Sequence, residues 1–186
     1  LLPRSPMTLE TLGTSFSRLN QHALACEAFG RLVALHPEHP GYRFNFATSL
    51  LFCGRMEPAE LQLEQCLELD PGFWKAYPAL AKLRKQTRER NHLEKLLAVL
   101  PDAEGDAAIY LHMALAKEYE DLGEYPIAFD HLALGKAIAR KPKRYSFSRD
   151  QAVFEAVQTH FVPGPEGRGH PAREPIFVFG MPRSGT

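Results

Sequence analysis

The stretch Leu9-Glu-Thr-Leu-Gly-Thr-Ser-Phe16, followed by Ala25-Cys-Glu-Ala-Phe29 and then Pro37, decides the fold of this chain. Apolar and small residues recur in both segments at the three- and four-residue spacing of an amphipathic helix. Asn20 stands between the segments, where it can adopt the left-handed backbone of a tight turn. The pattern therefore predicts two antiparallel helices joined by a short turn.

The same pattern returns thirty-four residues later, where Ala59, Leu63 and Pro71 repeat the anchors of the first unit. Near the end of the array it is carried again by Leu115, Ala116, Tyr119, Gly123, Ala128 and Leu132. This period and these positions resemble the tetratricopeptide repeat (TPR), whose unit is a helix pair. Four units are expected, near residues 6–39, 40–73, 74–107 and 109–142.

The third unit departs from the pattern. Leu93 occupies the position of the small residue at which the two helices of a repeat cross closely, and a loop at residues 101–105 replaces the closing proline. We therefore expect a wider crossing between the two helices of this unit.

The resemblance implies an all-α fold for residues 1–145, in which four helix pairs stack into a right-handed superhelix with a concave face. A further helix is expected at residues 146–162, where Val153, Phe154, Val157 and Phe161 form one apolar stripe that would cap the last repeat. Residues 163–174 are rich in proline and glycine, which predicts a linker.

The concave face of such an array is the expected place for a protein partner or peptide. The first helices of the repeats are expected to supply one apolar and one basic wall, from Phe44, Phe52, Lys75, Lys82, Lys85 and Lys117. An ordinary solvated lysine face is the alternative. Asn45 and Lys75 match two positions of the clamp by which some repeats bind a terminal carboxylate, but Glu10 would repel that group, which argues against a chaperone tail as the ligand.

The segment at residues 175–186 has a different character. Its sequence is Pro-Ile-Phe-Val-Phe-Gly-Met-Pro-Arg-Ser-Gly-Thr, and the run at residues 176–179 predicts a buried strand of an α/β sheet. Gly180 and Gly185 follow with four residues between them, so that backbone N–H groups can converge on a phosphate. The residues expected to hold that phosphate are Gly180, Arg183, Ser184, Gly185 and Thr186.

The residue after Gly185 is threonine, whereas nucleotide hydrolases have a lysine there. The segment instead resembles the loop that binds the 5′-phosphate of PAPS (3′-phosphoadenosine 5′-phosphosulfate) in sulfotransferases, including tyrosylprotein sulfotransferases. Together with residues 111–145, it resembles bacterial TPR sulfotransferases. The resemblance implies sulfuryl transfer from PAPS to a hydroxyl or amine, with Arg183 as a catalytic residue that stabilises the leaving group.

Two functions are therefore open from the sequence. In the first, the parent protein is a PAPS-dependent sulfotransferase acting on a protein, peptide or small-molecule acceptor, and residues 1–186 alone are inactive because the chain holds only the start of the enzyme domain. In the second, the chain is a non-catalytic TPR scaffold that binds peptides or partner proteins, and the terminal loop is an ordinary turn.

Composition and charge limit the classes of partner that we expect. Twenty-two basic residues balance twenty-two acidic ones, so neither nucleic acid nor a membrane surface is expected as a partner. Cys26, Cys53 and Cys66 lack metal-ligand spacing, and no metal is expected. We expect a cytoplasmic, bacterial protein, or one in the secretory-pathway lumen if a leader precedes Leu1.

Overall fold

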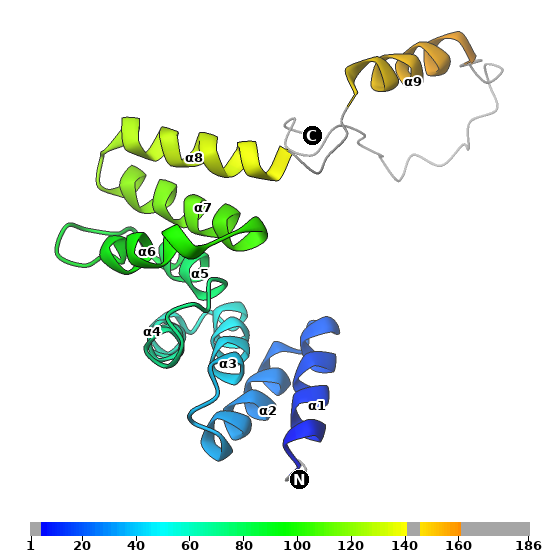
Figure 1. Ribbon diagram of the computed structural model, residues 1–186. Coiled ribbons are helices and arrows are strands. Elements are labelled where there is room, and N and C mark those ends of the chain that lie inside the picture. Colours follow the sequence, from blue (N-terminus) through cyan, green and yellow to red (C-terminus); the bar gives the residue numbers. More distant parts are fainter. Residues whose placement is uncertain (1–4, 141–145, 161–186) are drawn as a thin grey trace, which may run out of the picture. The chain divides into compact units, whose positions relative to one another are not determined.

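The computed structural model describes residues 5–140 and 146–160, and all regular secondary structure in these ranges is helical (Figure 1). The chain divides into two units, Leu1–Arg144 and Tyr145–Thr186. The helical repeat fold is confirmed for the first unit. The strand expected at residues 176–179 lies outside the described residues, and nothing in the described part supports it.

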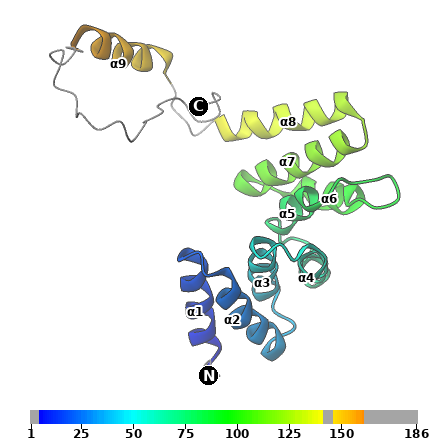
Figure 2. The same cartoon turned by 180° about the vertical axis from the view of Figure 1, so that it is seen from behind.

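The first unit contains four consecutive helix pairs within residues 5–140. Their bounds are α1 Pro6–Arg18 and α2 His22–Leu35, α3 Pro40–Phe52 and α4 Met56–Leu69, α5 Ala76–Leu83 and α6 Leu93–Val99, and α7 Gly105–Asp121 and α8 Tyr125–Arg140. A 3₁₀ turn, η1 Leu100–Asp102, follows α6. Seen from either side, these helices form successive layers in chain order (Figures 1 and 2).

Local sequence explains where the helices begin and turn. Pro6 and Pro40 start α1 and α3, at the helix position where a missing N–H costs nothing. Asn20, Gly54 and Gly123 adopt left-handed backbone, with φ of 57°, 73° and 80°, at the turns inside the first, second and fourth pairs. The turn predicted at Asn20 is therefore confirmed, and Gly54 and Gly123 have the same backbone at the corresponding turns.

Two apolar clusters hold the layers together. The first repeat is centred on buried Leu9, Ala25, Phe29 and Leu32, and Phe46 of α3 packs against them. The second cluster runs from α3 to α7 and contains Ala47, Leu63, Cys66, Leu67, Ala76, Tyr77, Leu80, Ala81, Leu96, Leu111, Ala114 and Leu115. Each helix pair thus buries one face against the next pair.

The third pair is the irregular one, as the sequence predicted. Helices α5 and α6 contact each other less than the two helices of any other pair, and α5 packs mainly against α7. The cause lies in the sequence, because Leu93 is too large for a close crossing and a nine-residue segment, 84–92, separates the two helices. Charged and polar side chains of this segment replace the missing helix contact.

Buried carboxylates anchor the 84–92 segment on both sides. Glu60 of α4 accepts from Arg84 Nε at 2.9 Å and pairs with Arg90 Nη2 at 2.8 Å. Glu118 of α7 is fully buried, accepts the backbone N–H of His92 at 2.7 Å and lies 2.9 Å from His92 Nδ1. The loop therefore bridges the second and fourth repeats where helix packing is weak.

The second unit contains the helix α9, Phe147–His160, within the range expected for a capping helix. The expected capping role concerns how this helix sits on the repeats, and it stays a prediction.

Replacing Gly13 by valine tests the close crossing in the first repeat. A Cβ at this position would lie 2.8 Å from the ring of Phe29, which is itself buried. We expect Gly13→Val to lower the free energy of unfolding by roughly 1–3 kcal/mol through overpacking. Urea denaturation measures the free energy of unfolding. The control is Ala23→Val at an exposed position of α2, which we expect to lower the free energy of unfolding by less than about 1 kcal/mol. Equal effects of the two variants would contradict the close crossing.

Replacing Glu118 by alanine tests the loop anchor. The backbone N–H of His92 would lose its buried acceptor, which costs roughly 1–3 kcal/mol. We expect faster amide hydrogen exchange in residues 84–92 together with this loss of stability. Glu68→Ala, at an exposed position of α4, is the matched control. Unchanged exchange in the loop would show that Glu118 does not hold it.

Candidate interaction site

The aromatic residues expected in a concave groove already have partners inside the array. Phe44 is partly buried against the second apolar cluster, and its ring centroid lies 5.3 Å from that of Phe73. Phe52 is 67% exposed, but its ring stacks on His22 with the centroids 4.3 Å apart. These two side chains therefore pack between repeats as well as facing solvent.

The lysines expected to form the basic wall differ in their surroundings. Lys75 Nζ lies 5.2 Å from the ring centroid of Trp74, and Lys117 Nζ donates to Asp121 Oδ1. Lys82 and Lys85 are exposed, and the charge of Lys85 contributes to lowering the pKa of Asp121. The wall is thus partly neutralised, and peptide binding there stays a prediction.

The predicted phosphate-binding residues fall outside the described part of the chain. This applies to Gly180, Arg183, Ser184, Gly185 and Thr186. PAPS binding is therefore untested. Within residues 5–140 and 146–160, no group of three or more histidine, cysteine, aspartate or glutamate side chains is placed to hold a metal ion.

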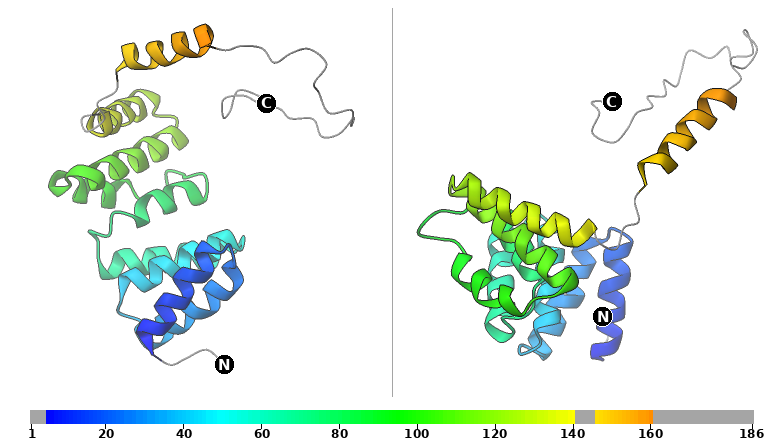
Figure 3. Two further views of the ribbon diagram at one scale, coloured as in Figure 1. Left: turned by 90° about the vertical axis from the view of Figure 1, so that its right-hand side faces the viewer. Right: turned by 45° about the horizontal axis from the view of Figure 1, so that its top comes forward.

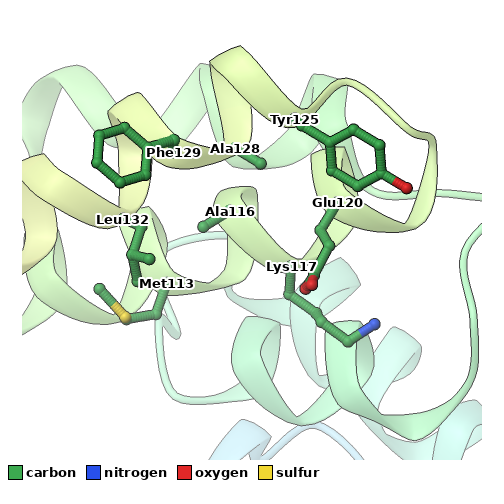
Figure 4. Close-up of a pocket in the computed structure, with 8 residues that line it drawn as sticks. All are labelled: Met113, Ala116, Lys117, Glu120, Tyr125, Ala128, Phe129 and Leu132. Carbon is green, nitrogen blue, oxygen red and sulfur yellow. The ribbon is translucent and has the colours of Figure 1, made fainter.

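A groove between α7 and α8, which the sequence did not predict, is a further candidate site. It encloses about 440 Å³ and is drawn in Figure 4. Its lining comprises Met113, Ala116, Lys117 and Glu120 of α7, and Tyr125, Ala128, Phe129 and Leu132 of α8. On each helix these residues follow the spacing i, i+3, i+4, i+7, so that each helix contributes one continuous face.

The floor and the walls of the groove differ in size and exposure. Ala116 and Ala128 are buried at the helix crossing, where their small side chains leave the space open. Tyr125 and Phe129 are each 67% exposed, and Leu132 is 39% exposed. The α7–α8 groove therefore presents large apolar side chains to solvent above a tightly packed floor.

The two ends of the groove have different chemistry. Phe129, Leu132 and Met113 gather at one end, whereas Tyr125, Lys117 and Glu120 lie at the other (Figure 4). Helices α7 and α8 lie side by side along most of their length (Figure 3).

The polar end is set by the pairing of Lys117 with Asp121. Burial alone would raise the pKa of Asp121, but hydrogen bonds from Lys117 and from the backbone of Gln86 outweigh burial, so the pKa lies below its ordinary value. Asp121 therefore stays ionised at neutral pH and neutralises Lys117. Glu120 is exposed beside this pair and adds a second carboxylate to the polar end.

A histidine pair joins α7 and α8. His112 Nδ1 lies 2.9 Å from His131 Nδ1, so one ring donates its N–H and the other must be unprotonated there. His131 also stacks on Tyr119, with ring centroids 5.6 Å apart. Burial lowers the pKa of His112, and the charge of His131 lowers it further; burial lowers the pKa of His131, although Asp130 opposes this.

One comparison in the sequence could have pointed to this groove. Ala116, Ala128 and Leu132 are core residues of the repeat pattern, and in the earlier repeats the matching positions are covered by the next helix pair. Within residues 5–140, no further helix pair follows the fourth to cover the matching face.

Comparison with known proteins supports the repeat fold. No protein-family model matches the chain. An uncharacterised protein of Aquifex aeolicus (strain VF5) is 27% identical over 157 residues, which are 81% of this chain and 20% of that protein. The TPR repeat-containing thioredoxin TTL4 of Arabidopsis thaliana is 27% identical over 119 residues, 61% of this chain and 17% of its own length. The chain thus spans about a fifth of these curated relatives.

Solved structures of MamA have a similar fold. One superimposes with a TM-score of 0.61 at 16% identity over 77% of this chain and 83% of MamA. A second gives a TM-score of 0.57 at 15% identity, over 78% of this chain and 80% of that one. Together with the TPR relative, these matches support a TPR-like helical-repeat fold.

The prediction that the parent protein is a sulfotransferase is wrong on these comparisons. The relative with a descriptive name is a TPR protein, the structural matches share the helical-repeat fold, and none of the proteins named here is a sulfotransferase. The prediction depended on the twelve-residue loop at residues 175–186, taken together with the repeat segment at residues 111–145.

None of the described helices combines the length and hydrophobicity that a membrane span requires.

Acidification tests the histidine pair. Because the pKa values of His112 and His131 are lowered in the folded state, the unfolded chain takes up protons first as the pH falls below about 6.5. We expect the midpoint temperature of thermal unfolding to decrease as the pH is lowered from about 7.5 to about 5.5. The decrease should be smaller in His131→Phe, which retains an aromatic ring against Tyr119. Thermal unfolding followed by circular dichroism measures the midpoint temperature at each pH. An identical pH dependence in His131→Phe would show that the histidine pair does not cause the loss of stability.

Proposed function

We propose that this chain is a non-catalytic scaffold that binds a partner protein through the α7–α8 groove. The observation that carries the proposal is the exposure of Tyr125, Phe129 and Leu132 around a preformed groove. Helical repeats commonly end in a unit with a polar outer face, because an apolar end would be exposed to water. The fourth repeat has an apolar face instead.

The composition of the groove supports a protein partner. Aromatic residues and methionine are enriched at protein interfaces and carry much of the binding energy. Here Phe129, Tyr125 and Met113 surround a floor made of two alanines. The floor belongs to a helix pair that also holds buried Leu111 and Leu115, so the site is built on a rigid element.

The concave face is a second candidate for the same kind of binding. A pocket of about 250 Å³ lies beside exposed Phe52, and Thr14, Asn45 and Thr48 supply polar groups to its lining. Lys82 and Lys85 are also exposed on the first-helix side of the third repeat. We propose this face as a weaker peptide site, because its pocket is smaller and Phe52 already stacks on His22.

Selection from a random peptide library displayed on phage, with the full chain as bait, tests the function. We expect enriched peptides whose binding is lost in Phe129→Glu and retained in Leu134→Glu. Both residues are exposed on α8, at 67% and 52%, but only Phe129 lines the groove. Enriched peptides that bind both variants equally, but fail with Phe52→Glu, would move the site to the concave face. No enrichment at either site would refute the scaffold function.

A further inference from the structure

We infer that Cys26 and Cys53 form an oxidisable pair, which a small-molecule disulfide converts into a covalent link between the first and second repeats. The observation that carries the inference is the contact of the two sulfur atoms, which lie 3.8 Å apart although the residues are 27 positions apart in the sequence. Both cysteines belong to the repeat array, so the inference goes beyond the proposed function and does not depend on it.

The two cysteines meet where the first two repeats pack together. Cys26 lies in α2, and Cys53 is the C-cap residue of α3. The residue before Cys53 is Phe52, whose ring stacks on His22, one turn before Cys26 in α2. The thiol contact is therefore part of a packed junction between α2 and the end of α3.

A disulfide bond requires only a small movement from this arrangement. An S–S bond is about 2.0 Å long, so the two sulfur atoms must approach each other by about 1.8 Å. Cys53 can supply the movement, because it ends its helix and precedes Gly54, which turns with φ of 73°. A Cβ added at Gly54 would meet nothing within 4 Å, so the turn has room to adjust.

The next junction of the array is linked at the corresponding place. Thirty-four residues after Cys26 stands Glu60 of α4, and its partner Arg84 is the C-cap residue of α5, as Cys53 is of α3. Arg84 Nε donates to Glu60 Oε1 at 2.9 Å. Side chains at equivalent positions therefore connect neighbouring repeats at both junctions, through an ion pair in one and through two thiols in the other.

The surroundings of the two thiols set the order in which they react. Cys53 is exposed and Cys26 is half-buried. Burial, the hydrogen bond with Cys53 and the charge of Cys53 raise the pKa of Cys26 to about 11, although the charge of Arg55 opposes this. Because the thiolate is the reactive form, we expect Cys53 to react first. Its thiol then no longer raises the pKa of Cys26, whereas Arg55 still lowers it.

The reaction is thiol–disulfide exchange with a low-molecular-weight disulfide such as oxidised glutathione. The Cys53 thiolate attacks one sulfur of this disulfide, whose S–S bond breaks, and a mixed disulfide forms as the first thiolate leaves. Cys26 then releases its proton and attacks Cys53 Sγ, which forms the Cys26–Cys53 bond and expels the second thiolate. The two cysteines lose two electrons and two protons, and the small disulfide gains them as two thiols.

Cys66 serves as an internal control. It is fully buried in the second apolar cluster, and burial raises the pKa of its thiol to about 11. A buried, protonated thiol reacts slowly with a disulfide in solution. In the folded chain we therefore expect Cys66 to remain a thiol while Cys26 and Cys53 are oxidised.

Titration of the full chain with oxidised and reduced glutathione tests the inference. In the unaltered chain we expect the number of free thiols to fall from three to one, and mass spectrometry of a digest to show peptides joined through Cys26 and Cys53. The titration is repeated on Cys66→Ala, folded and in urea. The ratio of oxidised glutathione to the square of reduced glutathione at half conversion should be at least about tenfold lower in the folded chain, because the fold holds the two thiols together.

Two single variants in the Cys66→Ala background test the order of reaction. Cys26→Ser should accumulate a mixed disulfide with glutathione at Cys53. Cys53→Ser should react at least about tenfold more slowly, because its remaining thiol at Cys26 is half-buried. Circular dichroism verifies that each variant is folded.

Four outcomes would overturn the inference. One is a stable mixed disulfide at Cys53 in a chain that retains Cys26, since the two sulfur atoms would then be unable to close. Another is a disulfide-linked dimer on a non-reducing gel, because Cys53 would then pair between copies. The others are equal half-conversion ratios with and without urea, and no loss of thiols from the folded chain at any ratio.

Discussion

The fold depends on one constraint: each helix pair must bury an apolar face against the pair that follows. A single pair cannot cover its own face, so stability accumulates only by stacking. The first repeat meets the constraint with Phe46 and Phe52 of α3, and the close approach at Gly13 makes room for Phe29. Within residues 5–140, α7 and α8 are the pair that no later helix pair follows, so their outer apolar face is the informative one.

The third repeat shows how the array tolerates a local failure of the pattern. With Leu93 at the crossing, α5 and α6 contact each other little, and the gap is bridged by Glu60 and Glu118 through Arg84, Arg90 and His92. Such buried polar contacts add little stability in themselves, but they fix the position of the segment, because leaving any partner unpaired is costly. Continuity from the second to the fourth repeat thus depends on charges as well as on packing.

The two ends of the sequence differ in how reliably their motifs predict structure and function. The repeat anchors recur over more than one hundred residues, and the structure has four helix pairs over the same part of the chain. The loop at residues 175–186 was a single short match, and the functional interpretation built on it is contradicted by the comparisons. Repetition provides independent tests of a pattern within one chain, and a single loop provides none.

The sequence by itself determined the helix pairs, the turns at Asn20, Gly54 and Gly123, the core positions and the irregularity of the third repeat, because these follow from local periodicity and backbone preference. Only the tertiary structure decided which apolar residues remain open. Phe129 and Leu132 follow the same helical periodicity as covered residues, and their exposure depends on what packs above them. The pairing of Lys117 with Asp121, which neutralises part of the expected basic wall, likewise required the three-dimensional arrangement, because charge in a sequence does not specify its partner.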